Sequence, residues 1–63
     1  MKIIILGAGQ VGRSAAYALS REEANEVTVV DHSDALLRDL QDRIDVRTVC
    51  GNAASPEVLK AAG

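Results

Sequence analysis

The sequence is poor in the residues that usually reinforce a small domain. It has 63 residues, and its single cysteine, Cys50, has no partner for an internal disulfide. No cluster of cysteine and histidine could hold a structural zinc, so we predict no metal site. A chain of this size buries only about 60% of its unfolded surface, which predicts marginal stability.

Aromatic residues, excess charge and long apolar runs are also scarce. Tyr17 is the single aromatic residue, so the stacking platforms that bind single-stranded nucleic acid are missing. Seven basic against nine acidic residues give a net charge of −2, which does not attract polyanions. The longest strongly apolar run, Ile3–Leu6, is too short for a membrane span or a signal peptide. We therefore expect a soluble, cytoplasmic protein without nucleic-acid partners.

What is present is an ordinary globular balance, 48% apolar and 25% charged, arranged as alternating strands and helices. Runs rich in β-branched residues predict strands at 2–6, 27–30 and 46–50. Helical spacing predicts a helix from 11 to about 20, whose apolar stripe consists of Val11, Ala15, Ala18 and Leu19.

Two further helices are predicted by capping residues. Ser33 is the expected N-cap of a helix with four apolar residues on one face (Leu36, Leu37, Leu40 and Ile44) and two i, i+4 ion pairs on the other (Asp34–Arg38 and Asp39–Arg43). A third helix starts at Ser55-Pro56-Glu57, with the serine hydroxyl as its cap, and Gly63 is the expected C-cap.

The resulting order, βαβαβα, predicts an α/β fold with a parallel sheet ordered 3-2-1, which is half of a Rossmann-like domain. In that arrangement the 2–6 strand, predicted to be buried on both faces, has an open apolar edge, which native proteins normally avoid. We therefore expect residues 1–63 to be the N-terminal half of a nucleotide-binding domain, truncated after its third helix, or to pair with another copy.

The strongest local signal is the turn Gly7-Ala8-Gly9-Gln10-Val11-Gly12, a G-x-G-x-x-G between a strand and a helix. Gly7 allows the tight turn, Gly9 lets a pyrophosphate approach the backbone, and Gly12 lets the helix pack near the strand. Free N–H groups and the helix dipole then attract phosphate. The alternative is a tight turn without a ligand.

Asp31 stands 19 positions after Gly12, where a Rossmann domain places its ribose-binding acid. A carboxylate there repels a 2′-phosphate, which favours NAD or an adenine nucleotide over NADP. The alternative is a cap of the following helix. Asn52 is equally consistent with an adenine contact, beside a small wall at Ala53, and with a turn residue tolerant of left-handed geometry.

Two further residues near these positions are interpreted as structural. His32 could border the adenosine, but it is expected to be a solvent-facing loop residue. Cys50 is expected to be a small buried hydrophobe, and nothing around it suggests a nucleophile. We predict no catalytic residue.

Several further segments are distinctive: 1–12, Val29-Val30-Asp31, 40–42, 45–46 and Gly51-Asn52-Ala53, with Pro56, Val58-Leu59 and Ala62-Gly63. Together they resemble the TrkA-N domains of bacterial Trk potassium uptake, which are also called KTN or RCK-type domains. The resemblance covers essentially the whole chain. It implies that Gly7, Ala8, Gly9, Gln10, Val11 and Gly12 hold a pyrophosphate, Asp31 the ribose, and Asn52 and Ala53 the adenine. Relatives that favour ATP have arginine at the place of Gln10, so glutamine favours NAD(H), with ATP, ADP or AMP as alternatives.

The resemblance also implies a function. It predicts a regulatory domain, not an enzyme, which forms a homo-oligomer (a dimer or a tetrameric ring) and attaches to a membrane potassium transporter at the inner face of the cell membrane. The competing hypothesis is the cofactor-binding part of an NAD-dependent dehydrogenase similar to saccharopine reductases. A bare assembly unit with a vestigial glycine loop ranks lowest.

Overall fold

The computed structural model describes residues 1–52 and 54–63, and their elements follow the predicted order. The strands are β1 (Lys2–Leu6), β2 (Glu26–Asp31) and β3 (Arg47–Cys50). The helices are α1 (Gln10–Leu19), α2 (Asp34–Arg43) and α3 (Pro56–Ala62). Each element begins within one residue of its predicted start.

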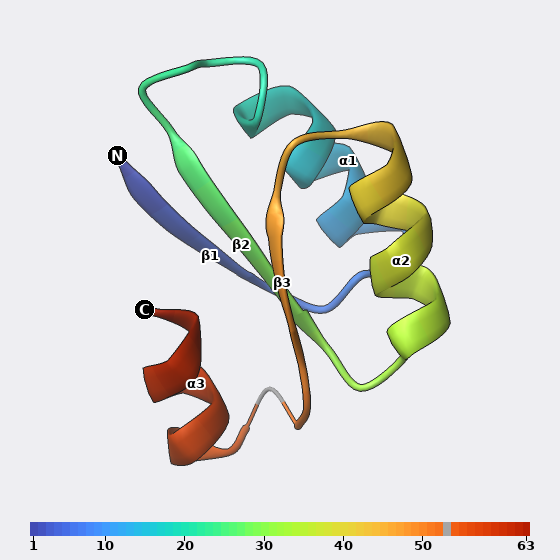
Figure 1. The fold of residues 1–63 in the computed structure, drawn as a ribbon, viewed down its shortest axis with the longest axis vertical. Coiled ribbons are helices and arrows are strands. Elements are labelled where there is room, and N and C mark those ends of the chain that lie inside the picture. The colour runs from blue at the N-terminus through green and yellow to red at the C-terminus, as the bar shows by residue number, and fades with distance from the viewer. Residues whose placement is uncertain (53) are drawn as a thin grey trace.

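The three strands form a parallel sheet in the order β1-β2-β3, which confirms the predicted Rossmann-like βαβαβα arrangement. Helices α1 and α2 cover one face of the sheet and α3 covers the other (Figure 1). In the strand register Leu6 lies opposite Val30, and Asp31 lies opposite Cys50. The carboxyl ends of the strands therefore meet at one edge of the sheet, where such folds bind ligands.

The central strand β2 is the most deeply buried strand of the sheet. Residues 27–31 are all buried, and Val27 and Val29 pack with Leu37 and Leu40 of α2 beneath the helical layer. Because side chains alternate along a strand, Thr28 and Val30 point to the face that α3 covers. A strand that is apolar on both faces is what a parallel sheet with helices on both sides requires.

Strand β1 is less buried than predicted. It lies at an edge of the sheet; Ile3 and Ile5 pack against the core, whereas Ile4 and Leu6 are 39% and 55% exposed. The prediction of burial on both faces was therefore wrong, because the α3 side of an edge strand is only partly covered.

The buried stripe of α1 also differs from the prediction. Val11 is 84% exposed and Ala18 is exposed, whereas Ala16 is completely buried. Leu19 packs against the core as predicted, but the phase of the stripe was wrong at Val11 and Ala18, because Gly12 rather than Val11 faces the strand. Gly12 and Ala16 are one turn apart, so they share the inward side of the helix.

Helix α2 forms with the predicted cap and ion pairs, and Leu37 and Leu40 of its predicted apolar face are buried. Leu36 on that face is 37% exposed, and Ile44 follows the helix as its C-cap. The Ser33 hydroxyl accepts a hydrogen bond from the Leu36 amide at 3.4 Å, so Ser33 is the N-cap. Both predicted ion pairs form, at 2.8 Å for Asp34–Arg38 and 3.2 Å for Asp39–Arg43.

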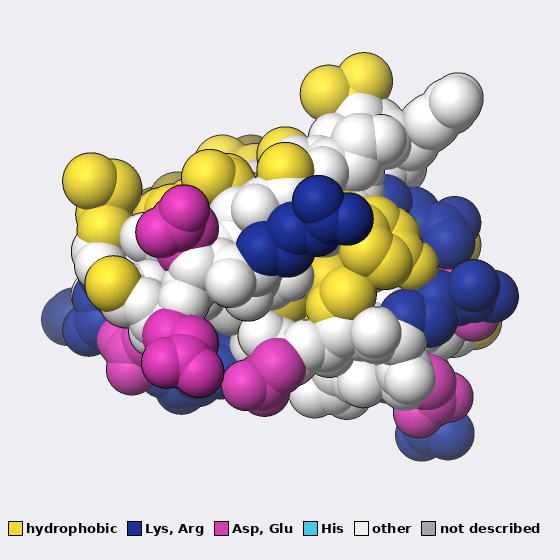
Figure 2. Space-filling model, turned by 90° about the horizontal axis from the view of Figure 1, so that it is seen from above, with side chains coloured by type: hydrophobic (Ala, Val, Ile, Leu, Met, Phe, Trp, Pro, Cys, Tyr) yellow, Lys and Arg dark blue, Asp and Glu magenta, His cyan; other side chains and the backbone are white. Residues whose placement is uncertain are grey.

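Acidic, basic and hydrophobic side chains are mixed on the face of the molecule shown in Figure 2.

Helix α3 begins with Pro56 in its first turn and ends at the C-cap Gly63. The predicted hydroxyl cap was wrong, because the Ser55 side chain makes no capping hydrogen bond. No helix among residues 1–52 and 54–63 has the length and apolar character needed to span a bilayer.

Candidate functional site

The glycine turn connects the end of β1 to the start of α1, and it is tied to β2 at two points. Gly7 has a φ of +102°, a conformation that side-chain-bearing residues rarely adopt. Its N–H donates to the Val30 carbonyl at 2.7 Å. The next residue, Ala8, is fully buried, and its N–H donates to Asp31 Oδ2 at 2.7 Å. The turn is therefore fixed against the last two residues of β2.

Gly12 allows the close helix–strand packing that its position predicted. A Cβ built on Gly12 would lie 2.0 Å from the Gly7 carbonyl oxygen and 3.4 Å from a methyl group of Ile5. Backbone atoms cannot come so close to a Cβ, so only glycine lets α1 approach β1 in this way.

Gly9, the middle glycine of the motif, is open to its surroundings. It is the N-cap of α1 in an extended conformation, with φ −71° and ψ −173°, which any residue can adopt. A Cβ built on it meets nothing within 4 Å. The first turn of α1 contains no acidic residue and Gly9 offers no capping side chain, so the positive end of the helix dipole is not neutralised within that turn.

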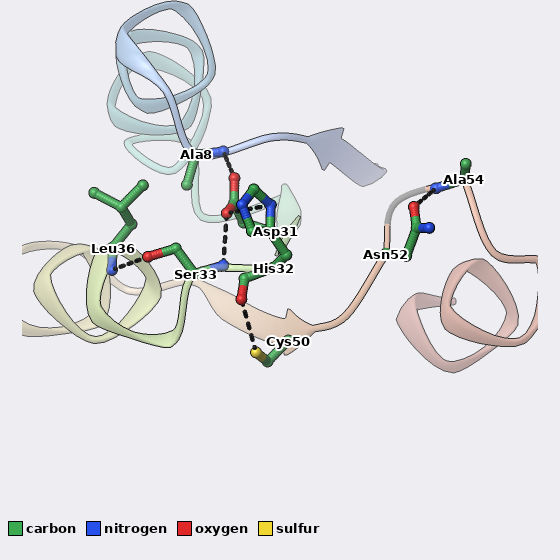
Figure 3. Close-up of polar contacts among 8 residues, drawn as sticks. All are labelled: Ala8, Asp31, His32, Ser33, Leu36, Cys50, Asn52 and Ala54. Atoms are coloured by element: carbon green, nitrogen blue, oxygen red, sulfur yellow. Dashed lines mark hydrogen bonds and ion pairs between the residues drawn. The ribbon is translucent and has the colours of Figure 1, made fainter.

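Asp31 is the best-connected polar side chain at this edge of the sheet. It ends β2, is 9% exposed, and accepts hydrogen bonds from the Ala8 amide through Oδ2 and from the Ser33 amide through Oδ1, at 2.7 and 2.8 Å (Figure 3). The hydrogen bond from Ala8, followed by that from Ser33, lowers the pKa of this carboxyl, and both outweigh the opposing effect of burial. Asp31 is therefore ionised at neutral pH, and Ser33 rather than Asp31 caps α2.

His32 and Cys50 lie beside this carboxylate. The His32 side chain is 90% exposed, in agreement with the prediction of a solvent-facing residue, and its Nδ1 lies 3.5 Å from Asp31 Oδ1. Cys50 is exposed, so the prediction of a buried hydrophobe was wrong: it is the last residue of the four-residue edge strand β3. Its thiol donates to the His32 carbonyl at 3.7 Å.

Asn52 follows β3 and forms a local turn. Its side-chain oxygen accepts a hydrogen bond from the Ala54 amide at 2.9 Å, as Figure 3 shows. The structure thus supports the turn interpretation, although Asn52 does not adopt the left-handed conformation that we associated with it. The predicted adenine wall, Ala53, lies outside the described residues.

Two hollows flank the glycine turn. The first has a volume of about 550 Å³ and brings together predicted residues from three segments; its lining consists of Leu6, Gly7, Val30, Asp31, His32 and Asn52. The volume is in the range of small-molecule sites. Residues of the glycine turn, of the end of β2 and of the segment after β3 therefore meet at one concave surface. Gln10 and Val11 are exposed on the first turn of α1 and do not line this hollow.

The second hollow, of about 520 Å³, was not predicted from the sequence. It lies between α1 and α2 and is lined by Ala8, Gly9, Gln10, Arg13, Ser14, Tyr17 and Leu36. Arg13, one of the lining residues, forms an ion pair with Asp39 of α2 at 3.1 Å. The four α1 side chains at positions 10, 13, 14 and 17 share one helix face, which is the sequence signal for this surface.

Comparison with known families decides the classification of the chain. The family model of the TrkA-N domain matches residues 3–63. The chain belongs to the TrkA-N domain family. This confirms the resemblance seen in the sequence.

The most similar curated relatives include full-length TrkA proteins. The Trk system potassium uptake protein TrkA of Halomonas elongata is 57% identical over all 63 residues, that of Vibrio alginolyticus 54% and that of Haemophilus influenzae 51%. The TrkA-N chain spans 14% of the length of each of these relatives. A shorter match, 58% over 38 residues, links 59% of the chain to 13% of a probable malate dehydrogenase of Campylobacter jejuni.

Proposed function

We propose that this TrkA-N domain binds NAD(H), or another adenine nucleotide, and serves as a regulatory module of a membrane potassium transporter. The observation that carries the proposal is the difference between the three glycines. Gly7 and Gly12 are required by the fold, through a positive φ and a 2.0 Å contact. Gly9 is required by neither, so a ligand that approaches its backbone is the physical reason for a glycine there.

The proposed binding mode uses the residues around the first hollow and the start of α1. The amides of the segment Gly7–Gly12 hold the pyrophosphate, favoured by the positive end of the α1 dipole. Asp31 accepts hydrogen bonds from the ribose hydroxyls, and the segment 52–53 borders the adenine. Supporting this mode, Asp31, Gly7 and Asn52 line the same hollow.

Charge favours NAD(H) among the ligands considered. The ionised Asp31 repels the 2′-phosphate of NADP, and the neutral side chain of Gln10 supplies no charge for the terminal phosphate of ATP. The proposed ligand order is therefore NAD(H) before ADP or ATP, and NADP last.

Regulation would follow from linkage. A nucleotide that binds one arrangement of a homo-oligomer more tightly than another shifts the population toward that arrangement. In this proposal the oligomer, a dimer or a tetrameric ring, sits at the cytoplasmic face of the membrane against the transporter. The names of the TrkA relatives, all potassium uptake proteins, support this partner.

The experiment is a titration of the full-length protein with NAD, NADH, ATP, ADP and NADP, with binding measured by calorimetry and potassium flux measured in reconstituted vesicles. We expect binding of NAD(H) and a change in flux. Asp31→Ala should weaken NAD binding by about 1.5–3 kcal/mol, roughly 10- to 150-fold, because charged hydrogen bonds are lost. Gly9→Val should abolish binding. An equal flux response to all five nucleotides, or none, would refute the regulatory function.

The partial match to a malate dehydrogenase supports one alternative, a cofactor-binding segment of a dehydrogenase. Hydride transfer needs a positioned acid or base near the reacting carbon. The only histidine, His32, has a side chain that is 90% exposed. We therefore expect no change in absorbance at 340 nm when the full-length protein is mixed with NAD and malate, and steady NADH formation would favour the dehydrogenase.

A further inference from the structure

Asp31 contacts the glycine turn directly. The Ala8 N–H that it accepts belongs to a residue 23 positions earlier in the chain, in a different element. Ala8 has no exposed surface, and the Asp31 side chain is 10% exposed. The bond is therefore a buried, long-range link between the end of β2 and the turn that follows β1.

We propose that Asp31 is a positioning residue for the phosphate loop, in addition to being a ribose acceptor: its Oδ2 holds the Ala8 amide and so fixes Gly7–Gly9 before a nucleotide arrives. The inference rests on the function proposed above and deepens it. Without the carboxylate, the buried Ala8 N–H would lose the acceptor it has here, and unpaired buried amides are disfavoured. The depressed pKa of Asp31 agrees with a strong, charge-assisted bond.

The link to Ala8 leaves room for a ribose. Each carboxylate oxygen can accept two hydrogen bonds, and each oxygen of Asp31 accepts one from a backbone amide, from Ala8 or from Ser33. Ribose hydroxyls can therefore add to this network without breaking it. A carboxylate already aligned by two amides loses little freedom when the ribose binds, which favours affinity.

The positioning role is tested first without a nucleotide, by amide hydrogen exchange measured by NMR. Alanine at position 31 removes both carboxylate oxygens, so the Ala8 amide loses its acceptor. We expect Asp31→Ala to accelerate exchange of the Ala8 amide at least 10-fold and to leave the Val29 amide in β2 unchanged. The matched control, Asp42→Ala, removes an exposed carboxylate of α2 and should leave both amides unchanged.

Equal exchange of the Ala8 amide in the native protein and in Asp31→Ala would overturn the inference. If that variant does not fold, an NMR measurement on the native protein tests the inference instead. Two hydrogen bonds of the turn, Ala8 to Asp31 and Gly7 to Val30, both measure 2.7 Å. Where the scalar coupling between the Gly7 nitrogen and the Val30 carbonyl carbon is detected, we therefore expect to detect the coupling between the Ala8 nitrogen and the Asp31 carboxyl carbon as well. Detection of the Gly7–Val30 coupling alone would refute the link.

A second arm compares ADP with 2′,3′-dideoxy-ADP, which has no ribose hydroxyls. If Asp31 acts only through the ribose, Asp31→Ala weakens ADP and leaves the dideoxy compound unchanged, and the inference fails. If Asp31 positions the loop, binding of the dideoxy compound also weakens, by at least 5-fold. Removal of a negative charge near a phosphate would by itself strengthen binding, so a loss reports on the loop. If the native protein binds neither these compounds nor NAD(H), the proposed function fails, and hydrogen exchange still tests the positioning role.

Discussion

Replacement of Gly12 by alanine offers the sharpest test of the packing between α1 and β1. The new Cβ would lie 2.0 Å from the Gly7 carbonyl oxygen, and contacts below 3.0 Å essentially never occur, so α1 must move by about 1 Å or more. Overpacking against backbone costs about 3 kcal/mol, at the upper end of the usual range. Alanine recovers about 1 kcal/mol of helix propensity. The net loss is therefore about 2 kcal/mol.

That loss is large for this chain. At roughly 0.05–0.15 kcal/mol per residue, the 63 residues have a total stability of about 3–9 kcal/mol. We expect the melting temperature, measured by circular dichroism, to fall by about 8–16 °C, since each kcal/mol corresponds to about 4–8 °C in a domain of this size. A decrease of less than about 4 °C would show that Gly12 is not at a close contact.

Gly9→Ala is the matched control. Its Cβ meets nothing within 4 Å, and its φ of −71° suits alanine, so we expect a change in stability of no more than about 0.5 kcal/mol. In the proposed binding mode the same methyl group obstructs the pyrophosphate, so NAD binding should weaken more than 10-fold. A Gly9→Ala protein that melts like the native one and binds NAD equally well would contradict the proposed phosphate site.

Three further predictions concern the cap, the carboxylate and the thiol. Ser33→Ala should cost about 0.5–1 kcal/mol in urea unfolding, because the cap of α2 is lost, whereas Ser55→Ala should cost less, because its hydroxyl makes no capping bond. The pKa of Asp31 is lower in the folded state than its ordinary value of 3.8, so its contribution to stability is present above about pH 4 and is lost as the pH falls further; Asp31→Asn should flatten this acid dependence of the free energy of unfolding. Cys50 is exposed, so Ellman's reagent should label it completely in the absence of denaturant, and labelling that requires urea would show that the thiol is buried.

The sequence predicted the elements well because their signals are local. Short β-branched runs define the strands, and Ser33 defines the start of α2 through a bond within one helical turn. Which side of α1 is buried is not a local property. A helical period gives the spacing of the inward residues, but the contact between Gly12 and Gly7 sets the phase, and that contact joins two elements.

The positions of the candidate site residues were also predictable only where they follow from spacing along the sequence. The spacing from Gly12 to Asp31 placed a carboxylate next to the turn, because the first two strands of a Rossmann domain end side by side. The exposure of Cys50 was missed because its burial was inferred from the apolar run alone, although the predicted strand order already placed that strand at an edge of the sheet. The second hollow was missed because it needs α2 to lie beside α1, which the pattern of either helix alone does not show.

Hydrogen bonds join the glycine turn after β1 to the end of β2, a link that the glycine motif alone does not predict. Gly7 and Ala8 donate to Val30 and Asp31, each at 2.7 Å, so the turn and the end of β2 form one hydrogen-bonded unit. A change that displaces the end of β2 must therefore displace the turn as well. Conversely, a ribose that contacts Asp31 and a phosphate that contacts the turn act on the same unit, so their binding free energies should be coupled rather than additive.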